Sequence, residues 1–298
     1  MTLRQSVGLA QAFTLSLTLK THPTPFSVVR YAGLALWPRA WGNCWISVDS
    51  GRINGIVRAG KRAGRTCWEV KDLYVTEGGG QVCSALLEKI AVEAGHAGAR
   101  RLFLRLANDS KVFNEARRSG FLPRYSERLF RWNIDNESKS PHMCPSDYRC
   151  RTRQPEDDNQ MFLLQHFQTP ENIRAYLPMN TEEWRDGLEH PPGSVTDQVV
   201  VSRDGRLDAW SRIGDAREVR YLSIMSRPGK NELSRHLFDS ATRDLEGRPL
   251  VALVPSFDQT FTQLFENVQE EFQGNYEMLV KPIALPVSHK RQMMVATG

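Results

Sequence analysis

Residues 68–121 carry the pattern that most restricts the fold of this chain. An extended apolar stretch (69–75) leads into Gly78, Gly79 and Gly80, and a helical apolar pattern follows from Val82 to Ala94. Free amides at the start of such a helix, together with its dipole, favour an anion beside the glycines. A plain flexible connector is the alternative, because glycines also serve ordinary loops. The stretch therefore predicts a strand, a turn and a helix, with an anion-binding role open.

A second strand and a second helix complete this unit. Residues 101–106 are predicted to be extended. The polar cluster 108–110 is predicted to cap a helix over residues 111–119. Gly120 is the expected left-handed residue after that helix, and Phe121 is expected to pack behind it.

The second half of the chain repeats this plan at low similarity. Residues 69–75 are echoed by 218–224, the turn at 49–52 by 203–206, and the strand 101–106 by 248–253. Both turns contain glycine between apolar-rich stretches, which is typical of hairpins. Three features repeated in one order indicate a duplication. The predicted fold class is α/β, a mixed and largely antiparallel sheet with helices on both faces, present twice.

The composition of residues 135–146 predicts a linker, because its first seven residues are polar and contain no aliphatic side chain. The predicted domains are therefore residues 1–134 and 147–298. The second domain is expected to open with a strand over 147–153, followed by a helix that starts near residues 155–158. The first domain opens instead with apolar segments of helical character, at 9–19 and 28–36.

The order of elements in residues 68–121 resembles the cofactor-binding core of the GNAT superfamily of acyl-CoA-dependent N-acetyltransferases. The resemblance implies a tandem two-domain member with degenerate motifs, in which the first domain keeps the better-preserved core. It implies acetyl-CoA as cosubstrate and a primary amine as acceptor. The cofactor-binding positions that it implies are Leu73, Val75, Gly78, Gly79, Gly80, Gln81, Val82 and Asn108.

The chain departs from the family pattern at several positions. The family's arginine in the glycine motif falls on Gly78, the middle glycine falls on Gln81, and the loop is about two residues short. The tyrosine that protonates the departing CoA thiolate in the family falls on Ala116. Tyr125 lies just downstream and is a substitute candidate for this acid, with a buried structural tyrosine as the alternative.

Glu69 is the candidate general base, because a carboxylate on this strand is placed to take a proton from the acceptor through water. Strict alternation assigns Glu69, Lys71, Leu73 and Val75 to one face of the strand. Glu218 occupies the matching position in the second half. A surface strand residue is the alternative for each glutamate.

Cysteine and histidine spacing predicts neither a disulfide framework nor a metal site. The five cysteines are odd in number and have no CxxC spacing, and the seven histidines are scattered. No apolar run approaches the roughly 20 residues of a membrane span. These features and the lack of a cleavage signal predict a cytoplasmic protein with reduced thiols and no membrane partner.

Charge is distributed unevenly between the halves. Residues 1–149 contain 22 Lys and Arg against 12 Asp and Glu, and residues 150–298 contain 17 against 22. The basic half suits an anionic partner, such as a phosphorylated cofactor, an acidic substrate or a nucleic acid, and a solvated basic surface is the alternative. A nucleic acid is an unlikely partner, because no recognition motif accompanies the arginines. The partner expected is a small-molecule or peptide amine, and a homodimer is possible.

Two functions of different classes follow from the sequence. The first is an acetyl-CoA-dependent N-acetyltransferase. The second is a catalytically silent tandem GNAT fold that acts as a CoA-binding or protein-interaction module.

Overall fold

A computed structural model describes residues 12–18, 43–133, 144–178, 180–243, 245, 247–266 and 271–283. The apolar segment 28–36 and most of the predicted linker lie outside these residues. Among the described residues, no helix has the length and hydropathy that a membrane span needs.

The first half contains five strands and three described helices. They are α1 (Leu15–Thr18), β1 (Asn43–Asp49), β2 (Arg52–Lys61), β3 (Cys67–Val75), α3 (Gly80–His96), β4 (Arg101–Ala107), α4 (Phe113–Arg118) and β5 (Leu122–Trp132). The turn between β1 and β2 has positive φ at Ser50 and Gly51, as a tight hairpin requires. The predicted hairpin is therefore confirmed.

The second half repeats this order after an added strand and a group of helices. Its elements are β6 (Tyr148–Thr152), a 3-10 turn (Pro155–Asp157), α5 (Asp158–Gln168), α6 (Glu171–Arg174), α7 (Thr181–Gly187), β7 (Ser194–Ser202), β8 (Leu207–Asp215), β9 (Arg220–Ser226), α8 (Asn231–Ala241), β10 (Leu250–Pro255), α9 (Gln259–Glu266) and β11 (Glu271–Pro282). The predicted opening strand and acidic helix start of this half are both present.

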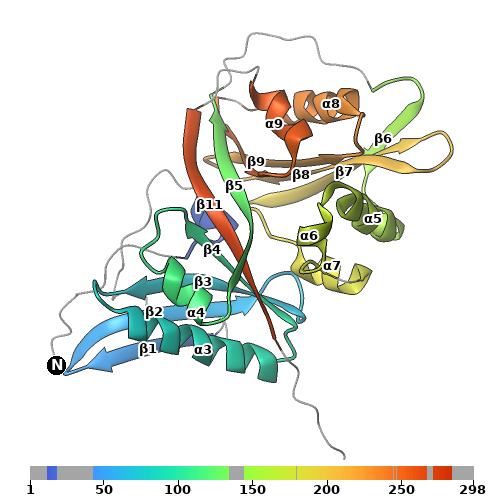
Figure 1. Cartoon of the computed structure of the whole chain (residues 1–298). Helices are drawn as coiled ribbons and strands as arrows, with labels where there is room; N and C mark the ends of the chain where they lie inside the picture. Colours follow the sequence, from blue (N-terminus) through green and yellow to red (C-terminus); the bar gives the residue numbers. More distant parts are fainter. Residues whose placement is uncertain are drawn as a thin grey trace, which may run out of the picture.

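All eleven strands join one mixed sheet in the order β1-β2-β3-β4-β11-β5-β10-β9-β8-β7-β6. This order contains an exchange between the halves. The last strand, β11, lies between β4 and β5 of the first half and is antiparallel to both. In turn, β5 pairs with β10 of the second half. Figure 1 shows β5 and β11 running side by side through the centre of the molecule. The mixed α/β fold is confirmed, and the boundary at 135–146 stays a prediction because the halves share their central strands.

Two apolar cores hold the helices against the sheet. In the first half, Leu87 and Ile90 of α3 pack on Leu73 of β3 and Leu104 of β4. In the second half, Leu233 and Leu237 of α8 pack on strands β8, β9, β10 and β5. Helices α5 and α7 cover β7 and β8 through a separate cluster that includes Trp184 and Trp210. Figure 1 shows α8 and α9 on one side of these strands and α5, α6 and α7 on the other.

One sequence expectation about β3 is wrong. The register with β2 shifts between Arg58 and Ala59, which pair with Asp72 and Val70, so Lys71 is an extra residue in a β-bulge. The bulge reverses the alternation beyond it. Trp68, Val70, Leu73 and Val75 therefore share the α3 core, and Glu69 lies on the opposite face from Leu73 and Val75.

The start of the helix after β4 also differs from the expectation. Helix α4 begins at Phe113, and its cap residue Val112 makes no side-chain hydrogen bond. The backbone supplies the turn instead, because Phe113 N–H donates to Ser110 O at 3.2 Å. The end of this helix is as predicted: Gly120 has φ +82° and Phe121 is fully buried.

Candidate functional site

Two pairs of parallel strands start together and then diverge. Strand β3 pairs with β4 only from Cys67 to Glu69, and β9 pairs with β10 only at Arg220 and Tyr221. Beyond these points each pair of strands leaves an opening toward its carboxyl ends. Openings of this kind at the carboxyl ends of parallel strands are frequent ligand sites.

The first opening is occupied by the chain itself. Ala12 forms an isolated antiparallel bridge with Leu106 of β4, and Phe13 N–H donates to Arg105 O at 3.0 Å. Ala12 is fully buried in the α3 core. Leu15 then reaches the other face of the sheet, where it packs on Tyr221 and Leu253. Residues 12–15 therefore thread through the opening between β3 and β4.

The glycine turn of the first half faces a carboxylate. Gly79 caps α3 without a side-chain hydrogen bond, as the predicted free helix end requires. A Cβ placed on Gly80 would lie 3.0 Å from Glu115 Oε1. Glu115 Oε2 is buried and accepts no hydrogen bond from the described residues. The side chain of Glu115 thus brings negative charge to the place where the sequence predicts an anion.

The opening between β9 and β10 differs from the first one both in what occupies it and in the charge at its turn. Among the described residues, the Ala12–Leu106 contact is the only isolated bridge, so no such segment pairs with the free edge of β9. Arg220 N–H donates to Pro249 O at 3.0 Å across the starting point of the opening. Successive residues of a strand point their amides to opposite edges, and the pairing of Tyr221 with Val251 uses the N–H of Leu222. The N–H of Ile224 therefore faces the opening beyond this pair, where it can bind a carbonyl oxygen.

The turn between β9 and α8 carries two cations. Gly229 has φ +79°, and a Cβ there would meet no atom within 4 Å. Arg227 Nε lies 2.9 Å from Asp208 Oδ1, and its guanidinium lies over the ring of Phe167. Lys230 Nζ lies 5.4 Å from the centre of the Tyr148 ring. This turn is therefore positively charged, whereas the corresponding turn of the first half approaches Glu115.

A cavity of about 170 Å³ lies on the face of the sheet covered by α5, α6 and α7. Strands β8, β9 and β10 contribute Trp210, Arg212, Tyr221, Ser223, Met225, Leu253 and Pro255, the first half contributes Leu15, Arg62, Phe103, Tyr125 and Glu127, and the helical segment contributes Gln165, Leu177, Pro178, Trp184, Gly187, Leu188 and Glu189. The cavity thus borders the second opening and lies between the halves.

Charged side chains from both halves form one network at this cavity. Arg105 donates to Glu127 Oε2 at 2.6 Å and to Glu189 Oε1 at 2.8 Å. Arg62 lies 2.8 Å from Glu189 and 3.3 Å from Glu69. The network contains three carboxylates and two guanidiniums, which gives a net charge of −1. Arg62 also lies 3.8 Å from the centre of the Phe103 ring, so its position is fixed by packing as well.

The pKa values of the two cavity carboxylates are shifted in opposite directions. Burial raises the pKa of Glu127 above its ordinary value, although Arg105 opposes this effect. Burial also acts on Glu189, but Arg105 and Arg62 outweigh it and hold the pKa of Glu189 below its ordinary value. The single guanidinium that both carboxylates share cannot fully offset the effect of burial on both of them. The effect of burial therefore prevails in the pKa of Glu127.

Two buried tyrosines line the same cavity. Burial raises the pKa of Tyr125 and of Tyr221, and the nearby glutamates add to the effect. Both phenols therefore keep their protons at neutral pH. The ring of Tyr125 packs edge-on against Phe257, with centres 5.4 Å apart.

The predicted site residues are distributed over two places. Tyr125 lines the cavity, and Glu69 lies behind Arg62 without lining the cavity itself. Leu73 and Val75 are core residues under α3, and Gly78–Gly80, Gln81 and Val82 form the turn and first residues of that helix. Asn108 is exposed and its N–H donates to Asn275 O. Glu218 is exposed in the turn before β9, outside the strand.

Sequence reasoning missed Glu127, Glu189 and Arg105, which form the centre of the charged network. Arg105 is almost fully buried in the middle of an apolar strand, and a charge in such a run is the signal that was available. No sequence pattern connects it to Glu189, which is 84 residues away.

A search of protein-family models found no match, and a search of curated proteins found none either. Solved structures, however, share the arrangement. A GCN5-related N-acetyltransferase from Sphaerobacter thermophilus superposes with a TM-score of 0.56 at 14% identity, over 95% of this chain and 97% of its own. A tandem GNAT protein from the clavulanic acid biosynthesis pathway gives 0.51 at 13% identity, over 91% and 93%.

The fold is a tandem GNAT fold. These structures cover nearly the whole chain, so the GNAT arrangement extends over both halves. In this GNAT fold the diverging strand pairs are β3 with β4 and β9 with β10, and the cavity with its charged network lies between the two halves.

Proposed function

We propose that this protein is an acyl-CoA-dependent N-acetyltransferase whose working site is the cavity between the halves. The observation that carries the proposal is the opening between β9 and β10, which adjoins a cavity containing buried carboxylates and two protonated tyrosines. These are the groups that an amine and a thioester require: a base, an acid and a free amide for the developing oxyanion.

The second half is the proposed cosubstrate site. Arg227, Lys230 and the free end of α8 suit the pyrophosphate, because cations and helix N-termini both stabilise phosphate oxygens. The pantetheine arm would follow the free edge of β9, and the acyl carbonyl would accept a hydrogen bond from the N–H of Ile224. Ser223 and Met225 of the same strand line the cavity.

Glu127 is the proposed general base. Its raised pKa makes it a better proton acceptor than an ordinary carboxylate, and it lines the cavity directly. Glu69 stays a candidate from the sequence, acting on the network through Arg62. We place Glu127 ahead of it because Glu69 is not among the cavity residues.

Tyr125 is the proposed general acid. The acceptor ammonium gives one proton to Glu127, and the free amine attacks the thioester carbon. This attack forms the C–N bond and a tetrahedral intermediate, whose collapse breaks the C–S bond while Tyr125 transfers its proton to the leaving CoA thiolate. The second amine proton and the proton held by Glu127 pass to solvent, and Tyr125 takes one proton back from solvent, so that each turnover releases one proton.

The net charge of −1 in the network favours a positively charged acceptor. An ammonium group that binds beside the network of three carboxylates and two guanidiniums restores its neutrality, whereas a carboxylate would add a second uncompensated charge. A small-molecule or peptide amine therefore fits the site. The homodimer and the cytoplasmic location stay predictions from the sequence.

The first-half positions predicted for the cofactor stay a separate proposal. They would bind the cosubstrate only if residues 12–15 left the opening between β3 and β4. These positions are Leu73, Val75, Gly78–Gly80, Gln81, Val82 and Asn108. Glu115 would also have to turn away from the helix end.

Calorimetric titration with acetyl-CoA, followed by release of free CoA thiol with a panel of primary amines, tests the proposed function. Saturable binding with thiol release that depends on the amine is the expected result. Absence of binding at millimolar acetyl-CoA would refute it.

The second candidate function is a silent GNAT module that binds CoA or a protein without transfer. The occupied first opening and the carboxylate at its helix end favour this reading for the first half. Saturable acetyl-CoA binding without thiol release, across an amine panel and a range of pH, would support it.

A further inference from the structure

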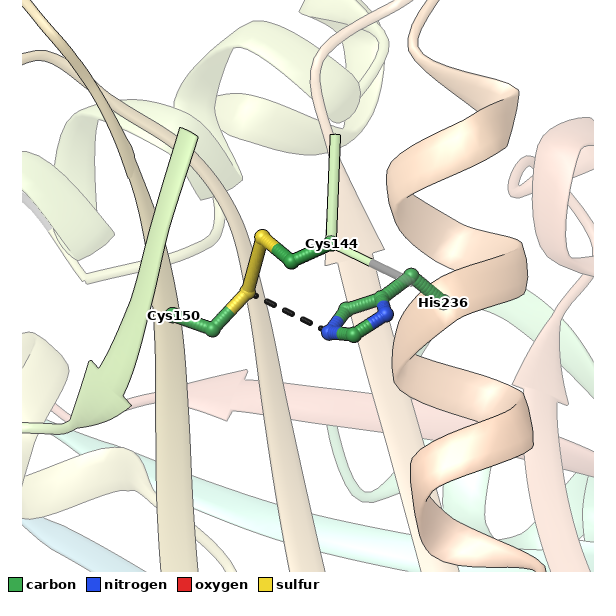
Figure 2. A group of neighbouring side chains, drawn as sticks. All are labelled: Cys144, Cys150 and His236. Carbon is green, nitrogen blue, oxygen red and sulfur yellow. Dashed lines mark hydrogen bonds between the residues drawn. A yellow bond between two sulfur atoms is a disulfide. The ribbon is translucent and has the colours of Figure 1, made fainter. Parts of the chain in front are cut away.

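Two cysteines and a histidine meet at the outer edge of the second half, away from the cavity. Cys144 lies just before β6, Cys150 lies within β6, and His236 lies on α8. The two sulfurs and one imidazole nitrogen all lie within 4.8 Å of one another. Figure 2 shows the three side chains pointing toward one common centre. The proximity is a property of the fold, since 86 residues separate Cys150 from His236.

The structure records Cys144 and Cys150 as a disulfide, with Cα atoms 6.8 Å apart. The sequence expectation of reduced thiols throughout is therefore wrong at this pair. Cys44, Cys67 and Cys83 are free. Five residues between two cysteines do not form a recognised motif, which is why the pair escaped sequence reasoning.

The imidazole of His236 lies beside the two sulfurs of the disulfide. His236 Nε2 lies 3.2 Å from Cys150 Sγ (Figure 2). A neutral disulfide sulfur is a weak acceptor and gains little from this contact. Two thiolates and an imidazole nitrogen are, in contrast, a common donor set for Zn²⁺. The same three atoms thus suit a metal once the sulfurs are reduced.

We propose that reduced Cys144 and Cys150, together with His236, bind one Zn²⁺ ion. Both thiols lose their protons to solvent on binding, and the imidazole binds in its neutral form through Nε2. Three protein ligands leave the fourth tetrahedral position to water, and the exposure of Cys150 gives solvent access to it. The disulfide and the metal-bound form exclude each other because they use the same sulfur electrons.

A metal here would join the segment before β6 to α8. Tyr148 lies between the two cysteines, and its ring contacts Lys230, the last residue before α8. Binding would therefore fix the Tyr148–Lys230 contact. The metal site itself stands on the three ligands and does not depend on the proposed acyl transfer.

Cobalt(II) titration of the full-length protein tests the proposal. The protein is reduced with a phosphine and freed of metal, and the absorption of Co²⁺ is followed. Reduced protein is expected to develop a thiolate-to-cobalt charge-transfer band and tetrahedral d–d bands that saturate at one equivalent, and Zn²⁺ is expected to abolish them. The oxidised protein, with its disulfide intact, is expected to give no bands.

Matched variants separate this site from other thiols. Because Cys150 is exposed, the Cys150→Ser variant should fold, and it is expected to lose the charge-transfer band. His236→Asn is expected to shift the band and weaken binding, with circular dichroism as the check on folding. Cys44 is also exposed, and Cys44→Ser is expected to leave the cobalt titration unchanged. Reduced wild type without the bands, or a Cys150→Ser variant that keeps them, would overturn the proposal.

Discussion

Glu127 and Glu189 show how one guanidinium can divide two carboxylates into different chemical roles. Both accept hydrogen bonds from Arg105, yet only Glu189 also meets Arg62. The pKa of Glu127 is therefore raised and that of Glu189 is lowered. Separated pKa values of neighbouring acids are a recurring property of catalytic sites.

Glu127→Gln is expected to lower kcat/KM by about 100-fold or more, because removal of a general base typically costs that amount. The glutamine oxygen still accepts a hydrogen bond from Arg105, so folding should be preserved. Steady-state CoA release with a reactive amine is the measurement.

Glu69→Gln is the matched control, since Glu69 touches the same network but does not line the cavity. A smaller loss is expected there. If Glu69→Gln is the more damaging change, the base is Glu69.

Asp258 gives a pH-dependent prediction about stability. It lies before α9, where it accepts a hydrogen bond from Phe261 N–H, and burial raises its pKa to about 6. The folded state therefore holds this proton more tightly than the unfolded state, in which the pKa is about 3.9. Stability from this group is largest below pH 4 and declines as pH rises through about 6.

Asp258→Asn removes this titration but keeps an oxygen for the helix cap. The unfolding free energy of the variant relative to wild type is expected to increase by about 1–3 kcal/mol between pH 4 and pH 7. Urea unfolding at several pH values measures it. Parallel pH curves for the two proteins would contradict the assignment.

At the scale of elements, the two glycine-containing turns are similar in chain position and opposite in charge. The turn after β3 approaches Glu115, and the turn after β9 carries Arg227 and Lys230. The turn after β9 is therefore the better proposed position for a phosphate.

Lys230→Ala is expected to weaken acetyl-CoA binding about tenfold, because it removes a charge-assisted phosphate contact. The salt dependence of binding should become shallower. Lys111→Ala is the control, since Lys111 pairs with Glu77 beside the first-half turn and is highly exposed. Calorimetry at two salt concentrations distinguishes them, and the reverse ranking would assign the cosubstrate to the first half.

Leu15→Ala addresses the segment that fills the first opening. Leu15 is buried between the halves against Leu129, Tyr221 and Leu253. Truncation is expected to lower the unfolding free energy by about 2–4 kcal/mol, as for other buried leucines. A thermal-denaturation midpoint equal to that of wild type would show that residues 12–18 do not hold this position in solution.

The local sequence pattern was sufficient to predict most helices and strands, but it was insufficient to predict which residues contact one another in the fold. The hairpins, α3 and the helix end at Gly120 follow from residues close together in sequence. The bulge at Lys71 could not be foreseen, because one extra residue changes the facing of a strand without changing its composition. The contact of Arg105 with Glu189 and the contact of Cys150 with His236 join residues 84 and 86 positions apart, which no local period encodes.

At the scale of the whole molecule, the exchange of β5 and β11 makes the halves inseparable. The first half depends on β11 for the strand between β4 and β5, and β10 depends on β5 for its outer neighbour. The first half alone would therefore expose two long unpaired strand edges and apolar side chains that are buried in the whole molecule.

Expression of residues 1–138 alone is expected to give aggregated or unfolded protein. Co-expression with residues 139–298 is expected to give a complex that copurifies and shows one unfolding transition. A first half that folds cooperatively by itself would contradict this interdependence.

The same exchange sets the timing of folding during synthesis. Strand β11 ends at Pro282, so the gap between β4 and β5 stays open until residue 282 has been made. At roughly 5–20 residues per second, the interval between completion of β5 and of β11 is on the order of ten seconds. During that time the edges of β4 and β5 that pair with β11 in the folded protein stay without this partner.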